Sequence, residues 1–82
     1  MSKDDIKLIF QESLKQVAPE ISFEKINLDI PLRDQIEIDS LDLYNIIVSL
    51  QKKTGVYIPD SKLAELTNLN ELISYVFAQI KT

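Results

Sequence analysis

Three stretches of this chain repeat apolar residues at the spacing of an amphipathic helix, and this pattern constrains the fold most. Over residues 3 to 17 the apolar positions recur every three or four residues, which places them on one helical face. The second stretch runs from near Ser40 to Lys53 or Thr54, and the third from Asn68 to about residue 80. A short helix is expected over residues 61 to 66. The sequence therefore predicts an all-α fold, a small four-helix bundle of three longer helices and one short helix.

Helix-ending and helix-starting residues lie at the borders of these stretches. Pro19 is expected to stop the first helix, and Gly55 fits the left-handed position just past the second. Asp60 is expected to cap the short helix. Asn68 and Glu71 have the spacing of a capping box that opens the last helix.

The segment from residue 18 to residue 39 has no helical period. Its apolar residues alternate at 26, 28 and 30 and again at 36 and 38, which is also compatible with two short strands. Two short strands without a third partner would be marginally stable. We therefore expect a long ordered loop that pins its apolar side chains onto the helices, and loops of this length are often functional.

Composition excludes several classes of function. A length of 82 residues fits one domain, residues 1–82, with little room for a deep catalytic cleft. Without Cys or His, and with one Gly, the chain lacks the usual general base, thiolate or imidazole metal ligands and a glycine-rich phosphate loop. We expect no catalytic residues, no metal site and no enzymatic activity. No apolar run is long enough for a membrane span, and no signal peptide is recognisable, so a cytoplasmic location is expected. We also expect a monomer.

The net charge of −4 is concentrated in one segment. Between Asp29 and Asp42 five acids accompany a single base, Arg33, whereas the rest of the chain is balanced. This balance argues against nucleic acid, which needs clustered Lys and Arg. The segment is either a solvated acidic loop or a recognition surface for a basic partner.

The second long helix has more apolar surface than one bundle needs. One face carries Leu43, Ile46, Ile47 and Leu50, and a second stripe beside it carries Leu41, Tyr44 and Val48. The first face is expected in the core. The second is either buried as well, which would make this the central helix and is favoured by pattern alone, or left partly exposed for a partner.

Ser40 is the residue at which chemistry is most plausible. It stands at the predicted start of the second helix, and the simplest interpretation is that Asp39 or Ser40 caps the helix. As a nucleophile it has no neighbouring base. As an attachment point for a phosphate it is better placed, because helix N-termini stabilise anions.

The strings PLRDQIEIDSL, from residue 31, and DLYNIIVSLQKKTGVYIPD, from residue 42, resemble the acyl carrier protein family and its peptidyl carrier relatives. The resemblance covers nearly the whole chain: a first helix, a long loop, DSL at the second helix, IPD before a short helix, and a final helix. It implies that Ser40 receives 4′-phosphopantetheine from coenzyme A through a separate Mg-dependent transferase. The thiol of that arm would carry an acyl group as a thioester, so the chain itself needs no Cys.

The resemblance also implies roles for other residues. Asp39 and Leu41 would flank the attachment site. The implied partner-binding residues are Asp34, Glu37, Asp39, Leu41, Asp42, Tyr44 and Val48. The implied acyl-chain pocket and core residues are Leu43, Ile46, Ile47, Leu50, Ile58, Leu63, Leu72 and Val76. The implied partners are a phosphopantetheinyl transferase (holo-carrier synthase), acyl-activating or acyltransferase enzymes, and condensing enzymes.

The sequence departs from the family pattern near Ser40. Glu37 stands where the family usually has Gly, Ile38 replaces a smaller residue, and the second helix has Asn45 at an expected Glu and ends in Lys52 and Lys53. These differences suggest a specialised carrier with its own enzymes. The leading hypothesis is an acyl carrier protein for fatty-acid, polyketide or related biosynthesis. The alternatives are an aminoacyl or peptidyl carrier, and an unmodified carrier-like interaction module.

Overall fold

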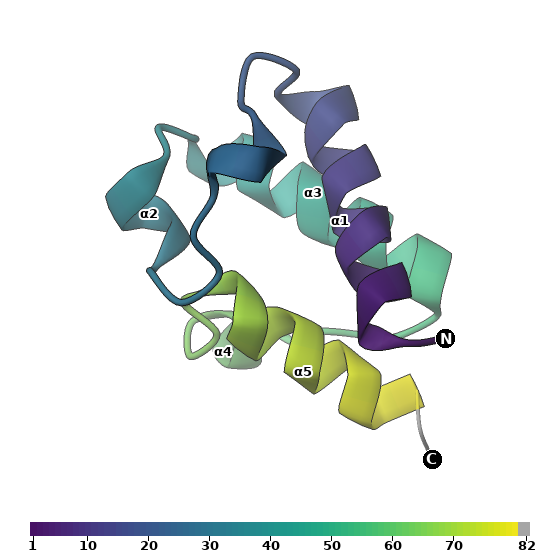
Figure 1. Cartoon of the computed structure of the whole chain (residues 1–82). Coiled ribbons are helices and arrows are strands. Elements are labelled where there is room, and N and C mark those ends of the chain that lie inside the picture. The colour runs from purple at the N-terminus through teal and green to yellow at the C-terminus, as the bar shows by residue number, and fades with distance from the viewer. Residues whose placement is uncertain (81–82) are drawn as a thin grey trace.

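The computed structural model describes residues 1–80 and shows a bundle built on three long helices (Figure 1). These are α1 (Lys3–Val17), α3 (Ser40–Thr54) and α5 (Leu69–Ile80). Two four-residue helices, α2 (Leu32–Gln35) and α4 (Asp60–Leu63), join them. The all-α bundle predicted from the sequence is confirmed, and the predicted bounds of the first two long helices match the structure.

Helix α1 begins with a capping box that the spacing of its apolar residues did not reveal. The Ser2 hydroxyl accepts a hydrogen bond from the Asp5 backbone N–H at 3.2 Å, and Asp5 accepts one from the Ser2 backbone N–H at 2.8 Å. This second bond is the main reason why the pKa of Asp5 lies below its usual value. The helix ends at Val17, two residues before Pro19, because the residue before a proline disfavours the helical conformation.

The predicted ends of α3 and α5 are also confirmed. Gly55 follows α3 with a φ of 75°, a left-handed conformation that Gly adopts without strain. Before α5, the Asn68 side chain accepts from the Glu71 N–H at 2.8 Å, and Glu71 accepts from the Asn68 N–H at 3.4 Å. This is the capping box expected from their spacing.

The sequence placed the short helix too late in the chain and assigned its cap to the wrong residue. Helix α4 covers Asp60–Leu63 rather than residues 61 to 66, and Asp60 lies inside its first turn instead of capping it. Pro59 occupies the cap position, and its carbonyl accepts from the N–H groups of Lys62 and Leu63. The proline provides extended backbone at the helix start, so no side-chain cap is formed.

The segment between α1 and α3 contains no strand in the part of the chain that is described. It is an ordered loop, as expected, but it includes two helical turns that the sequence pattern did not predict: a 3₁₀ turn at Phe23–Lys25 and helix α2. Pro31, with a φ of −52°, precedes α2 and suits a helix start. Such short turns leave no period in the sequence, because one turn contributes only one or two apolar positions.

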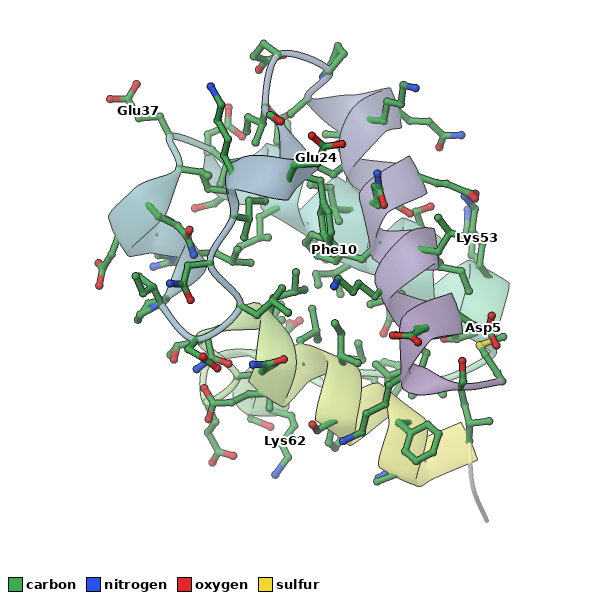
Figure 2. All side chains as sticks on the ribbon, in the orientation of Figure 1. Asp5, Phe10, Glu24, Glu37, Lys53 and Lys62 are labelled. Atoms are coloured by element: carbon green, nitrogen blue, oxygen red, sulfur yellow. The ribbon has the colours of Figure 1, made fainter. Side chains whose placement is uncertain are left out.

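The core lies where α1 packs against α3 and α5. Phe10 of α1 points into the interior (Figure 2), with its ring centroid 6.2 Å from that of Phe23. Between α1 and α3 the buried hydroxyl of Ser13 bonds to the Ile9 carbonyl at 2.9 Å and to the Ser49 hydroxyl at 2.9 Å. This polar pair is satisfied, so it fixes how the two helices meet without leaving a buried group unpaired. Over residues 1–80 no helix combines the length and apolar character needed to cross a bilayer.

Candidate functional site

Ser40 is the first residue of α3 and is exposed to solvent. The helix is capped by Asp39, whose Oδ1 accepts a hydrogen bond from the Asp42 N–H at 2.7 Å. Asp39 therefore fills the capping role that the sequence left open between the two residues. The Ser40 hydroxyl makes no hydrogen bond with any of residues 1–80, so it is free for chemistry supplied from outside.

Four acids surround this serine on the surface. Asp34, Glu37 and Asp39 are exposed and Asp42 is half-buried. Figure 2 shows Glu37 directed away from the body of the molecule. The ion pairs found among residues 1–80 are Lys53–Glu12 and Lys62–Glu65, so these four carboxylates keep their charge unpaired. Together they form an acidic surface of the kind that attracts a basic partner.

Glu37, at the position where the family usually has Gly, introduces no backbone strain. Gly55 is the only residue with a positive φ in the described chain, so Glu37 has a conformation open to any L residue. The neighbouring Ile38 is half-buried and packs against the core. The loop therefore accommodates both departures from the family pattern.

The second apolar stripe of α3 lies at the surface. Leu41 is 67% exposed and Tyr44 is 53% exposed, while Val48 is half-buried. The interpretation favoured by pattern alone, that this second stripe is buried as well and the helix is central, is wrong. The physical reason is that α1 and the core cover the opposite side of α3, where Ile46 and Leu50 are fully buried.

An apolar cavity of about 520 Å³ opens beside Ser40, between α2, α3, α4 and the start of α5. Of the predicted pocket and core residues, four line it: Leu43, Ile47, Leu63 and Leu72. The other four are buried in the main core without reaching the cavity: Ile46, Leu50, Ile58 and Val76. Lining residues that the sequence did not suggest are Pro31, Leu32, Arg33, Asp60, Ala64, Leu66, Thr67 and Asn68. The predicted partner residues Asp34 and Tyr44 also line the cavity.

Hydrogen bonds between distant segments hold the far wall of this cavity. The Leu32 N–H donates to the Thr67 carbonyl at 3.1 Å, and the Asn70 N–H donates to the Leu28 carbonyl at 3.1 Å. The Asn68 side chain adds a bond of 3.3 Å to the Asp29 carbonyl. These bonds fasten the loop before α2 to the start of α5. Figure 1 shows the two segments on the same side of the bundle as α2 and α4.

Gln35 holds the loop together from within, a role that no sequence pattern indicated. Its Oε1 accepts from the Asn27 N–H at 2.7 Å, and its Nε2 donates to the carbonyls of Asn27 at 2.7 Å and Ile30 at 2.9 Å. One side chain thus satisfies three backbone groups that have no helical partner. It fixes the position of α2 and, through α2, one wall of the cavity.

We expect Gln35→Ala to lower the free energy of unfolding by about 1.5–4.5 kcal/mol, since three bonds are lost and each contributes about 0.5–1.5 kcal/mol. Amide hydrogen exchange at Asn27, measured with urea unfolding, should become faster because its N–H loses its acceptor. Gln16→Ala, an exposed position on α1, is the matched control and should change neither quantity. Unaltered protection of Asn27 in Gln35→Ala would contradict this role.

Within residues 1–80 no group of three or more acidic, His or Cys side chains is arranged to hold a metal ion. The arrangement around Ser40 suits a different kind of chemistry. A free hydroxyl at a helix N-terminus can carry a phosphodiester, whose charge the unpaired first-turn N–H groups stabilise. The neighbouring apolar cavity can hold the far end of a flexible arm or its cargo. The residues present therefore fit a covalently attached phosphopantetheine.

Comparison of the sequence with known proteins points to the same attached group. A family model described as "phosphopantetheine attachment site" matches residues 4–76. The acyl carrier protein homolog of Mycoplasma pneumoniae is 38% identical over 76 residues, covering 93% of this chain and 89% of that protein. The acyl carrier proteins of Treponema denticola and Helicobacter pylori are 32% and 31% identical, covering 76% and 89% of this chain and 80% and 87% of their own.

The matched family holds 4′-phosphopantetheine on a serine and works with a phosphopantetheinyl transferase and with biosynthetic enzymes. Its members carry intermediates and leave the catalysis to those enzymes. The family model and the similar relatives, together with the helical fold, show that this chain belongs to the acyl carrier protein family.

Proposed function

We propose that this protein carries acyl intermediates as thioesters on a 4′-phosphopantetheine arm attached to Ser40. The supporting observation is the exposed Ser40 hydroxyl, left free because Asp39 caps α3. The proposal treats residues 1–82 as one carrier domain, monomeric and cytoplasmic. Its cargo would belong to fatty-acid, polyketide or related specialised biosynthesis.

The attachment step follows from the chemistry of coenzyme A. The Ser40 Oγ attacks the phosphorus on the pantetheine side of the pyrophosphate, and the serine proton passes to a base of the transferase. A phosphodiester forms at Ser40, and adenosine 3′,5′-bisphosphate leaves. Asp39 and Leu41 flank the serine, and the N-terminus of α3 stabilises the new anion.

The cavity beside Ser40 favours an acyl cargo over an aminoacyl one. Its volume of about 520 Å³ lies within the usual range for small-molecule pockets, and side chains such as Leu43, Ile47 and Leu63 make its wall apolar. An alkyl chain gains free energy by leaving water there. The ammonium group of an aminoacyl cargo would lose its hydration against these apolar side chains, and the lining carboxylates that could compensate for this loss, those of Asp34 and Asp60, are exposed.

The surface around Ser40 is proposed to bind the partner enzymes. Basic groups on a transferase, an acyl-activating or acyltransferase enzyme, or a condensing enzyme would face the acidic side chains. Apolar groups on the same partners would contact the exposed stripe of α3. The proposed contact residues are Asp34, Glu37, Asp39, Leu41, Asp42, Tyr44 and Val48.

Arm addition tests the function directly. The protein is incubated with coenzyme A, Mg²⁺ and a broad-specificity phosphopantetheinyl transferase, and its intact mass is measured. We expect one arm per chain, and one acylated arm when octanoyl-coenzyme A replaces coenzyme A. Failure of the folded wild-type chain to gain mass would overturn the proposal.

The acidic surface should set the rate of that reaction. We expect Asp39→Asn to slow arm addition a few-fold at low salt, because one attractive charge is lost while Asn still caps the helix. Added salt should slow the wild type, since the screening length is only about 10 Å at 0.1 M. The measurement is the initial rate of modification at several salt concentrations.

Asp4→Asn is the matched control for charge. Asp4 is exposed in the first turn of α1, at the opposite side of the molecule from the start of α3 (Figure 1). Its loss should leave the rate unchanged. A wild-type rate that does not depend on salt would argue against electrostatic steering.

A further inference from the structure

Tyr44 lies at the boundary between the cavity and the solvent. Ser40, Leu43, Tyr44 and Ile47 follow the spacing of one helical side, and all four line the cavity. Their exposure differs greatly along that side: Ile47 is 3% exposed, whereas Tyr44 is 53% exposed. Ile47 therefore belongs to the inner wall, and the Tyr44 ring belongs to the rim, one turn from the hydroxyl of Ser40.

No hydrogen bond and no aromatic or cation–π contact with residues 1–80 restrains the ring of Tyr44. Tyr75 differs, because the Lys62 ammonium lies 5.5 Å from its ring centroid. An unrestrained side chain on a helix surface changes rotamer in picoseconds to nanoseconds. Tyr44 can therefore move over the opening of the cavity at little cost.

The opposite rim is formed by α4. Asp60, Leu63 and Ala64 line the cavity from that side. Leu63 is half-buried, whereas Asp60 and Ala64 are exposed. An acyl chain entering between α3 and α4 would have the Tyr44 ring on one side and Leu63 on the other. A tyrosine suits this position, because its ring is apolar and its hydroxyl can stay in water.

We propose that Tyr44 is the gate of this cavity and determines which cargo the carrier shelters. This inference rests on the proposed acyl carriage on Ser40. A cargo long enough to enter packs beneath the ring, which closes over it and restricts access of water and nucleophiles to the thioester. A cargo as short as acetyl gains nothing, because it does not reach past the ring. The same ring belongs to the proposed partner surface, so one side chain both covers the cargo and contacts the partner enzyme.

The test compares the chemical protection of two cargoes. Wild type, Tyr44→Ala, Tyr44→Phe and Leu8→Ala are loaded at Ser40 from acetyl- or octanoyl-coenzyme A, and intact mass verifies loading. Thioester cleavage by hydroxylamine is then timed. In the wild type the octanoyl thioester should survive longer than the acetyl one. Tyr44→Ala should reduce this protection about tenfold, equivalent to about 1.4 kcal/mol of ring–chain contact.

Two variants separate the gate from general effects. Tyr44→Phe should keep the protection, because the ring and not the hydroxyl covers the chain. Leu8→Ala is the matched control, since Leu8 is similarly exposed, at 52%, but lies on α1 and does not line the cavity. It should also keep the protection. Equal loss in Leu8→Ala and Tyr44→Ala, or loss in neither, would overturn the gate.

A second measurement needs no variant. In protein labelled with ¹³C-tyrosine, octanoyl loading should shift the ring signals of Tyr44 and leave those of Tyr57, which is exposed and away from the cavity, unchanged. Acetyl loading should shift neither. A Tyr44 signal that is insensitive to octanoyl cargo would refute the gate, while the mass gain at Ser40 would leave acyl carriage intact.

Discussion

Replacing Ser40 by alanine should abolish arm addition completely, while the wild type gains one arm per chain. The reason is that alanine has no oxygen to form the phosphodiester, and Asp39 continues to cap α3. The fold should survive, because the Ser40 side chain is exposed and makes no hydrogen bond in the described structure. Intact mass after incubation with coenzyme A and transferase measures modification, and circular dichroism verifies the fold.

The chain contains a matched control for this prediction. Ser61 also comes directly after an aspartate, is exposed, and lies near the start of a helix, α4. Ser61→Ala should be modified as fast as the wild type. The two serines differ in their next residues, because Ser40 precedes the exposed Leu41 and the acidic surface, whereas Ser61 precedes Lys62. Arm addition to Ser40→Ala, or no arm addition to Ser61→Ala, would show that Ser40 is not the attachment site.

Phe10→Ala should produce the largest loss of stability among the substitutions considered. Phe10 is fully buried and packs against Phe23 in the core. Truncating a buried Phe costs about 3–5 kcal/mol. At about 0.05–0.15 kcal/mol per residue, a chain of this size has roughly 4–12 kcal/mol in total. Urea unfolding followed by circular dichroism should show a much lower midpoint, and part of the population should be unfolded even without urea.

Leu8→Ala tests whether burial is the cause. Leu8 lies on the same helix, two residues away, but its side chain is exposed. Its truncation should change the free energy of unfolding by no more than about 0.5 kcal/mol. A cost close to that of Phe10→Ala would mean that Leu8 is covered in solution. A small cost for Phe10→Ala would mean that the core is less well packed than the structure shows.

The long helices could be predicted because their signals are local. The stripe through Ile6, Phe10 and Leu14 repeats at the helical period, and Gly55 and the Asn68–Glu71 box mark ends through bonds that span a few residues. The prediction of the short helices failed because it also depended on local signals. One turn contains too few positions to show a period, so α2 was missed and α4 was placed too late.

The serine proposed for attachment could also be selected from the sequence, through the DSL string and the strings around it. The sequence left open which residue caps α3. The structure assigns the cap to Asp39 and so frees the Ser40 hydroxyl. It likewise shows that Leu41 and Tyr44 are exposed, which the apolar pattern of the helix did not predict.

By itself, the sequence determined the helical class, the long helices and the acidic segment, and it selected the serine proposed for attachment, because each depends on residues close together in the chain. Only the tertiary structure showed where the cavity lies and which residues line it. Its wall combines Leu32 with Thr67 and Asn68, joined by hydrogen bonds between segments more than 30 residues apart. It also decided that Tyr44 stands at the opening, since a helical pattern shows which residues share a side but not which neighbour covers them.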